Sequence, residues 1–132
     1  MNVVAQFSAG LSALILIAVF PLEAFLIERP WVQRFLAIEP IGLENVRLWS
    51  FCIGARNAIA GVATLIGLWI VNYGDLAAGT MIVIISCCYM LLSSLAMGVA
   101  DLLGYWRPRG GSVKGTIASS VFPAVALLAI AV

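Results

Sequence analysis

The chain contains no histidine. This absence removes the commonest protein ligand of transition metals and the side chain that normally changes charge near neutral pH. It also excludes a Ser-His-Asp triad, because that mechanism needs an imidazole base. We therefore predict no metal site, and the sequence assigns neither a cofactor nor a catalytic residue.

Charge is scarce as well. Charged residues make up 10% of the 132 residues, whereas hydrophobic residues make up 64%. A soluble domain carries about 25% charged residues. The formal net charge of +1 excludes the strong positive field of a nucleic-acid-binding protein. The composition predicts an integral membrane protein whose partners are membrane lipids.

Cysteine is limited to Cys52, Cys87 and Cys88. All three lie within apolar segments, and adjacent residues on a helix point to different faces. We interpret them as small packing residues rather than as a disulfide or a metal site.

Long apolar segments are abundant. A membrane-spanning helix needs about 20 predominantly apolar residues, and the sequence offers four such segments. The first lacks a basic leader and a convincing cleavage site, so we expect a spanning helix there rather than a signal peptide. The predicted fold is all-α: an up-down bundle of four transmembrane helices forming one domain over residues 1–132. The predicted spans are 3–27, 49–71, 76–103 and 115–132.

The loop charges predict an orientation. Basic residues concentrate in the loops 28–48 and 104–114, whereas the loop 72–75 and the two termini have no basic side chain. Cytoplasmic loops carry the excess of Lys and Arg. We therefore expect a protein of the plasma (inner) membrane with both basic loops in the cytoplasm and both termini outside.

A short helix is predicted within the first basic loop, over residues 30–37. Pro30 suits the first position of a helix, Trp31 and Phe35 recur at helical spacing, and Pro40 ends the pattern. Such a segment favours an amphipathic helix lying in the membrane interface. The alternative is an irregular loop with aromatic residues.

Glu23, Arg56 and Asp101 lie inside otherwise apolar segments. A charge at membrane depth costs about 2.5 kcal/mol or more unless it is paired or hydrated. By helical rise, all three fall roughly 3 to 11 Å inside the cytoplasmic boundary. We predict that Glu23 pairs with Arg56, with Asp101 as a second acid and Asn57 as a neutral orienting group.

These four residues form the predicted ligand site, and two interpretations remain open. In the first, the protein binds or moves a small or amphiphilic anion, with Arg56 as the anion's partner and Glu23 as its resting counter-ion. In the second, the charges only hold the bundle together, or support a homo-oligomer or a larger membrane assembly.

Three segments carry a family resemblance. Residues 22–25 (Leu-Glu-Ala-Phe), 54–58 (Gly-Ala-Arg-Asn-Ala) and 122–124 (Phe-Pro-Ala) resemble motifs of a family of small bacterial four-helix membrane proteins of unknown function. The resemblance covers nearly the whole chain and implies the four-helix fold, but no activity. Arg56 stands where that family has tyrosine, and Ile53 where it has glutamine.

A second resemblance is architectural. The membrane-associated proteins of eicosanoid and glutathione metabolism are also four-helix proteins, with a basic first loop and an Arg-Asn pair in the second helix similar to Arg56 and Asn57. That similarity implies an enzymatic alternative, a membrane-embedded glutathione- or lipid-modifying enzyme. Arg56 would then hold a carboxylate or thiolate.

Overall fold

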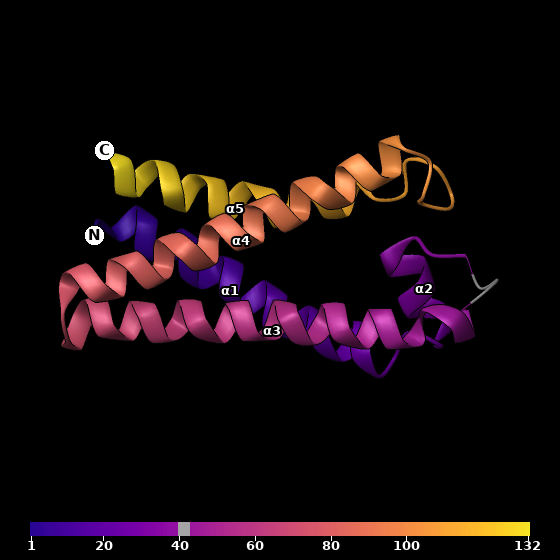
Figure 1. Cartoon of the computed structure of the whole chain (residues 1–132), viewed down its shortest axis with the longest axis horizontal. Helices are drawn as coiled ribbons and strands as arrows, with labels where there is room; N and C mark the ends of the chain where they lie inside the picture. Colours follow the sequence, from indigo (N-terminus) through magenta and orange to yellow (C-terminus); the bar gives the residue numbers. More distant parts are fainter. Residues whose placement is uncertain (40–42) are drawn as a thin grey trace.

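The computed structural model describes residues 1–39 and 43–132, and side chains except those of residues 40–45. The described residues form five helices and no strand (Figure 1): α1 (Val3–Ala24), α2 (Pro30–Leu36), α3 (Leu43–Tyr73), α4 (Leu76–Leu102) and α5 (Val113–Ala131). The four long helices are each long and apolar enough to cross a membrane. This architecture confirms the predicted all-α fold with four candidate spans.

The long helices form a four-membered ring. Helix α1 packs against α3 and α5, and α4 packs against the same two helices from the opposite corner. Both termini lie at one end of the bundle, whereas α2 and the α4–α5 loop lie at the other (Figure 1). We call the latter the basic end, because it carries Arg29, Arg34, Arg47, Arg107, Arg109 and Lys114. Which end faces the cytoplasm stays a prediction.

Two helix boundaries differ from the prediction by three residues or more. Helix α1 ends at Ala24, three residues early, because the carbonyl of Pro21 accepts bonds from the amides of both Phe25 and Leu26 and so closes the last turn. Helix α3 begins at Leu43 rather than near residue 49. Hydropathy marks where a helix enters an apolar medium, and a helix can continue beyond that depth as a polar segment.

The short helix in the first basic loop is confirmed as α2. Pro30 occupies its first turn, and Ala37 ends it with a left-handed φ of 53°. Its Val32 is buried, whereas Trp31 and Phe35 are 51% and 65% exposed. The aromatic side of α2 therefore faces away from the bundle, as expected for an interfacial helix. Pro40, the predicted stop, lies outside the described residues.

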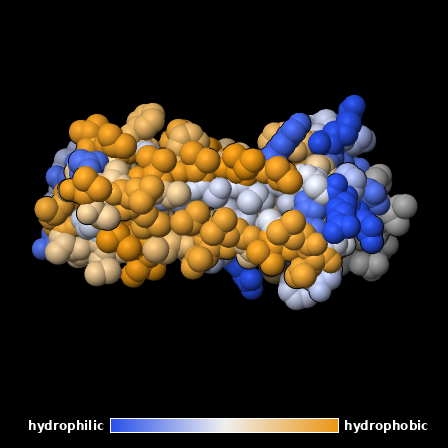
Figure 2. Space-filling model, turned by 90° about the horizontal axis from the view of Figure 1, so that it is seen from above, coloured by the Kyte–Doolittle hydropathy of each residue, from blue (hydrophilic) through white to orange (hydrophobic). Residues whose placement is uncertain are grey.

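Small side chains fill the bundle interior. The core includes Ala9, Ala60, Cys87 and Ala126, so the helices approach closely, as helices in lipid commonly do. The burial of Cys87 agrees with its interpretation as a packing residue. Large apolar side chains point outward and cover most of the visible face between the two ends, whereas hydrophilic residues gather at the basic end (Figure 2).

Candidate functional site

The structure places the four predicted site residues in three separate places. Glu23 and Asn57 meet between α1 and α3, Arg56 lies in a groove between α3 and α4, and Asp101 holds the α4–α5 loop. The predicted cluster is therefore not one site.

Glu23 and Asn57 form a polar contact within the bundle. The Asn57 amide donates to Glu23 Oε2 at 3.3 Å, and the Ser50 hydroxyl donates to the Glu23 backbone carbonyl at 2.6 Å. Gly54 lets α1 come this close, since a Cβ there would lie 3.1 Å from Glu23 Cβ and 3.2 Å from Glu23 Oε2. This contact joins the ends of α1 and α3 that approach the basic end.

The predicted pairing of Glu23 with Arg56 is wrong. Successive residues on an α-helix point about 100° apart, so once Asn57 faces α1, its neighbour Arg56 faces elsewhere. Gly54 and Gly61 share the side of α3 that packs closely on α1, and Arg56 projects from the opposite side. The Arg56 side chain is exposed, and no carboxylate among the described side chains lies within ion-pair distance of it.

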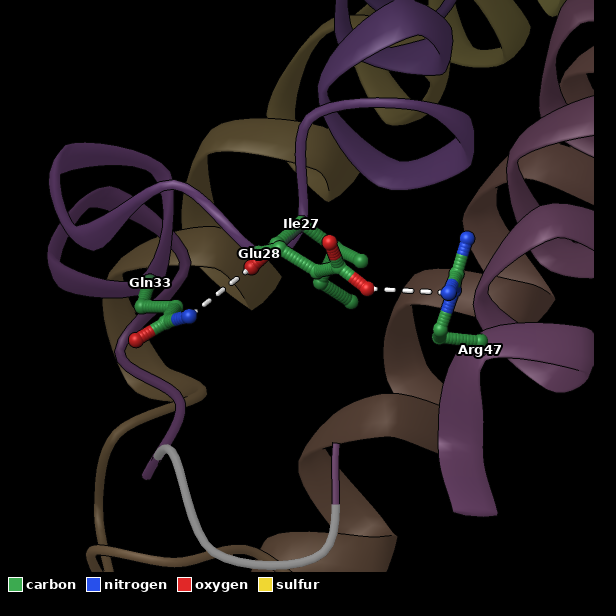
Figure 3. A network of polar contacts seen from close by, with 4 residues as sticks. All are labelled: Ile27, Glu28, Gln33 and Arg47. Atoms are coloured by element: carbon green, nitrogen blue, oxygen red, sulfur yellow. Dashed lines mark hydrogen bonds and ion pairs between the residues drawn. The ribbon is translucent and has the colours of Figure 1, made fainter. Parts of the chain in front are cut away.

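An ion pair that sequence reasoning missed lies at the basic end. Arg47 Nη1 contacts Glu28 Oε1 at 3.0 Å, and Gln33 donates to the carbonyl of Ile27 at 3.1 Å (Figure 3). The Arg47 and Glu28 side chains are 63% and 60% exposed, so the pair stabilises the fold by about 1 kcal/mol at most. These contacts fasten the α1–α2 turn to α3 and to α2.

The groove beside Arg56 combines polar and apolar walls. It encloses about 460 Å³ and is lined by Arg56, Ile59 and Ala60 of α3 and by Ile85, Ser86 and Tyr89 of α4. Arginine offers five N–H donors in a planar fork that matches a carboxylate or phosphate. The groove therefore presents an anion-binding group beside an apolar surface.

Ser86 adds a hydroxyl to this groove. It is 7% exposed, yet the structure gives it no hydrogen bond within the described residues. By contrast, the hydroxyls of Thr64 and Ser94 donate to the carbonyls four residues before them. Sequence reasoning missed Ser86 and Tyr89, although their spacing of three residues places both on one face of α4.

The groove has a polar end and an apolar end. Helix α3 runs away from the basic end, so Arg56 lies nearer to that end than Ile59. Helix α4 runs toward the basic end, so Tyr89 lies nearer to it than Ile85. Arg56 and Tyr89 thus both line the part of the groove nearer the basic end. Ile59 and Ile85 line the other part.

Asp101 binds the α4–α5 loop. It is 5% exposed, and its Oδ1 accepts from the Gly110 amide at 2.7 Å. Its Oδ2 accepts from the amide and the hydroxyl of Ser112 at 2.9 and 2.7 Å. Within the same loop, the Trp106 indole donates to the Ala37 carbonyl at 3.0 Å. Asp101 therefore fixes the α4–α5 loop, and Trp106 ties that loop to the end of α2.

A pair of double-mutant cycles distinguishes this arrangement from the ion pair predicted from the sequence. We expect Glu23→Ala and Arg56→Ala to act additively on the free energy of unfolding, within about 0.5 kcal/mol, because the two side chains do not touch. Glu23→Ala and Asn57→Ala should couple by about 0.5 kcal/mol or more, because each removes the same hydrogen bond. Denaturant titration in detergent measures both cycles. Strong coupling between positions 23 and 56 would show that the charges do pair.

Comparison with known proteins gives one match. A family model described as "Protein of unknown function (DUF1304)" matches residues 10–131, a range that includes all three segments behind the family resemblance. Two of those segments meet at the Glu23–Asn57 hydrogen bond. Neither curated proteins nor solved structures match the chain. The chain therefore belongs to the DUF1304 family of proteins of unknown function.

Proposed function

We propose that this membrane protein binds an amphiphilic anion in the α3–α4 groove. The anionic head lies on the guanidinium of Arg56, and the hydrocarbon part lies along Ile59 and Ile85. The observation that carries this proposal is an exposed guanidinium on a candidate membrane-spanning helix that opens on a groove and meets no carboxylate among the described side chains.

The position of Arg56 requires a partner. It lies seven residues after Trp49 on α3, which is about 10 Å along the helix. A guanidinium facing lipid at such a depth is costly unless it reaches a polar group. Among the described residues the protein supplies no acid for it, and an anion from the bilayer meets this need.

The wall composition favours an amphiphile over a small soluble anion. Ile59 and Ile85 are 69% and 62% exposed, so half of the groove is an apolar surface open to hydrocarbon. In this groove a small ion would find polar contacts only at Arg56, Tyr89 and the Ser86 hydroxyl. An amphiphile uses both halves, with the head near the basic end and the chain toward the middle of the bundle.

Photolabelling with a phospholipid tests the proposal. The probe is phosphatidylglycerol with a diazirine in its acyl chain, present as a minor component of phosphatidylcholine vesicles that hold the protein. We expect adducts at Ile59 and Ile85. Arg56→Gln should lower them about tenfold, because one charge-assisted contact contributes about 1.5 kcal/mol or more. Arg56→Lys should fold normally and label weakly, since it keeps the charge but loses the planar fork.

Two controls make the result decisive. Arg47→Gln removes an exposed guanidinium of the same helix and should leave the Ile59 and Ile85 adducts unchanged. The same diazirine on phosphatidylcholine should label these residues only weakly. Equal labelling by the two lipids, or full labelling of the Arg56→Gln protein, contradicts the proposal. The proposal is also contradicted if a second copy of the chain covers the groove and excludes the probe.

A further inference from the structure

A second groove, between α4 and α5 at the basic end, is larger than the Arg56 groove. It encloses about 680 Å³, within the range of about 300 to 1,000 Å³ that small-molecule sites occupy. Its walls include Leu95, Val99, Leu102, Val113 and Ile117. Val99 is 53% exposed and Ile117 is 58% exposed. The groove is thus an apolar channel open along its side to the surroundings of the bundle.

The depth of this groove is set by a close helix contact. A Cβ on Gly98 would lie 3.2 Å from Thr116 Cγ2, so α4 and α5 nearly touch there. Nearer the basic end, Leu102 of α4 and Val113 of α5 line the two sides of the groove. The α4–α5 loop then closes the groove at its end with Arg109, Gly110 and Ser112.

The mouth of the groove carries the guanidinium of Arg109 and the carboxylate of Asp101. Both oxygens of that carboxylate accept hydrogen bonds from Gly110 and Ser112. The side chain of Arg109 is exposed, and no carboxylate among the described side chains lies within ion-pair distance of it. Because Asp101 binds the amide next to Arg109, it also holds that residue at the mouth.

We infer that the α4–α5 groove binds an acidic phospholipid of the bilayer. One acyl chain lies against Val99 and Ile117, and the phosphate lies on Arg109. Two features favour this occupant: walls that are mostly apolar, and a guanidinium at the end of the groove that makes no ion pair with the described side chains. Phosphate is the group that a guanidinium fork binds in two-pronged geometry. The inference rests on residues that the Arg56 site does not use.

The two grooves share α4 as a wall. Ile85, Ser86 and Tyr89 face the groove with α3, whereas Leu95, Val99 and Leu102 face the groove with α5. Each groove has an arginine toward the basic end and apolar side chains away from it. Both sites therefore take a lipid in the same orientation, with its head toward the basic end.

Mapping of photoadducts tests this second site separately from the first. With diazirine-labelled phosphatidylglycerol in phosphatidylcholine vesicles, we expect adducts at Val99 and Ile117. Arg109→Gln should lower them about tenfold, the effect of one charge-assisted contact. Arg107→Gln, in the same loop but outside the groove, should leave them unchanged. Val99→Trp should fill the groove and remove the Ile117 adduct, whereas Val121→Trp, elsewhere on the apolar surface, should leave it unchanged.

The outcomes separate the two sites. Loss of the Val99 and Ile117 adducts in the Arg109→Gln protein, with those at Ile59 and Ile85 retained, supports a distinct second site. Arg56→Gln should give the reverse pattern. The inference is overturned if phosphatidylcholine labels Val99 as strongly as phosphatidylglycerol does, or if Arg109→Gln has no effect. The α4–α5 groove would then be an ordinary lipid-facing surface. Displacement of the probe by inorganic phosphate alone would also overturn it, because the walls would then contribute nothing.

Discussion

Replacing Gly79 with alanine is expected to destabilise the bundle by about 2 kcal/mol or more. A Cβ at this position would lie 2.6 Å from the amide nitrogen of Val71 and 2.8 Å from the carbonyl oxygen of Gly67. Both atoms belong to the backbone of α3, so no side-chain rotation relieves the overlap. The α3–α4 turn is short, and the Asp75 side chain caps the first turn of α4. Helix α4 therefore cannot move away without losing contacts along its length.

The matched control is Gly10→Ala on α1. A Cβ there would meet Leu68 Cδ1 at 3.5 Å, an ordinary van der Waals distance to the end of a flexible side chain. Alanine is favoured over glycine within a helix by roughly 0.5–1 kcal/mol, so this substitution should be neutral or slightly stabilising. Denaturant titration of both variants in detergent measures the contrast. Equal stability of the two proteins would mean that α3 and α4 do not approach as closely as the structure shows.

The positions of the helices follow from the sequence. Four apolar segments of spanning length correspond to α1, α3, α4 and α5, because backbone groups in hydrocarbon must be satisfied within the helix itself. Pro30 and the aromatic spacing after it also located α2. The end of α1 was harder to predict from the sequence. It depends on two amides that share the Pro21 carbonyl, and hydropathy does not reveal such a local arrangement.

The rotation of α3 about its axis was harder to predict. Its apolar residues surround the helix, so hydropathy does not mark which side faces α1. The informative signal was the spacing of Gly54, Asn57 and Gly61, three and then four residues apart, which defines one close-packing side. Arg56 lies outside that side. Cost arguments for a charge at membrane depth predict a partner for Arg56, but they do not identify that partner.

Asp101 lies near the end of α4, as the sequence predicted, but its bonding partners were not predicted. Its bonds go to the Gly110 and Ser112 amides and to one hydroxyl, and backbone donors leave little trace in a sequence. The available signal was the pattern Gly-Gly-Ser at positions 110–112, a turn followed directly by a helix. An acid in the last turn of the preceding helix, like Asp101 in α4, is well placed to bind such amides.

Asp101→Asn is expected to release the α4–α5 loop. The two carboxylate oxygens of Asp101 accept three hydrogen bonds, and a carboxylate has only acceptors. Asparagine replaces one oxygen with an NH₂ group, so whichever way the amide turns, at least one loop amide faces a donor. Buried donors left unpaired cost more than the bond itself contributes. Hydrogen exchange at the Gly110 and Ser112 amides should therefore accelerate by roughly tenfold or more.

Asp75→Asn provides the control for this last experiment. Asp75 accepts one bond, from the Ala78 amide to Oδ1, and asparagine caps a helix about as well as aspartate. Exchange at Ala78 should change little, although the substitution removes the same charge. If Asp101→Asn also leaves exchange at Gly110 and Ser112 unchanged, the carboxylate does not hold the loop. If exchange accelerates, phospholipid labelling at Val99 should fall in the same variant, because Arg109 is then no longer fixed at the mouth of the α4–α5 groove.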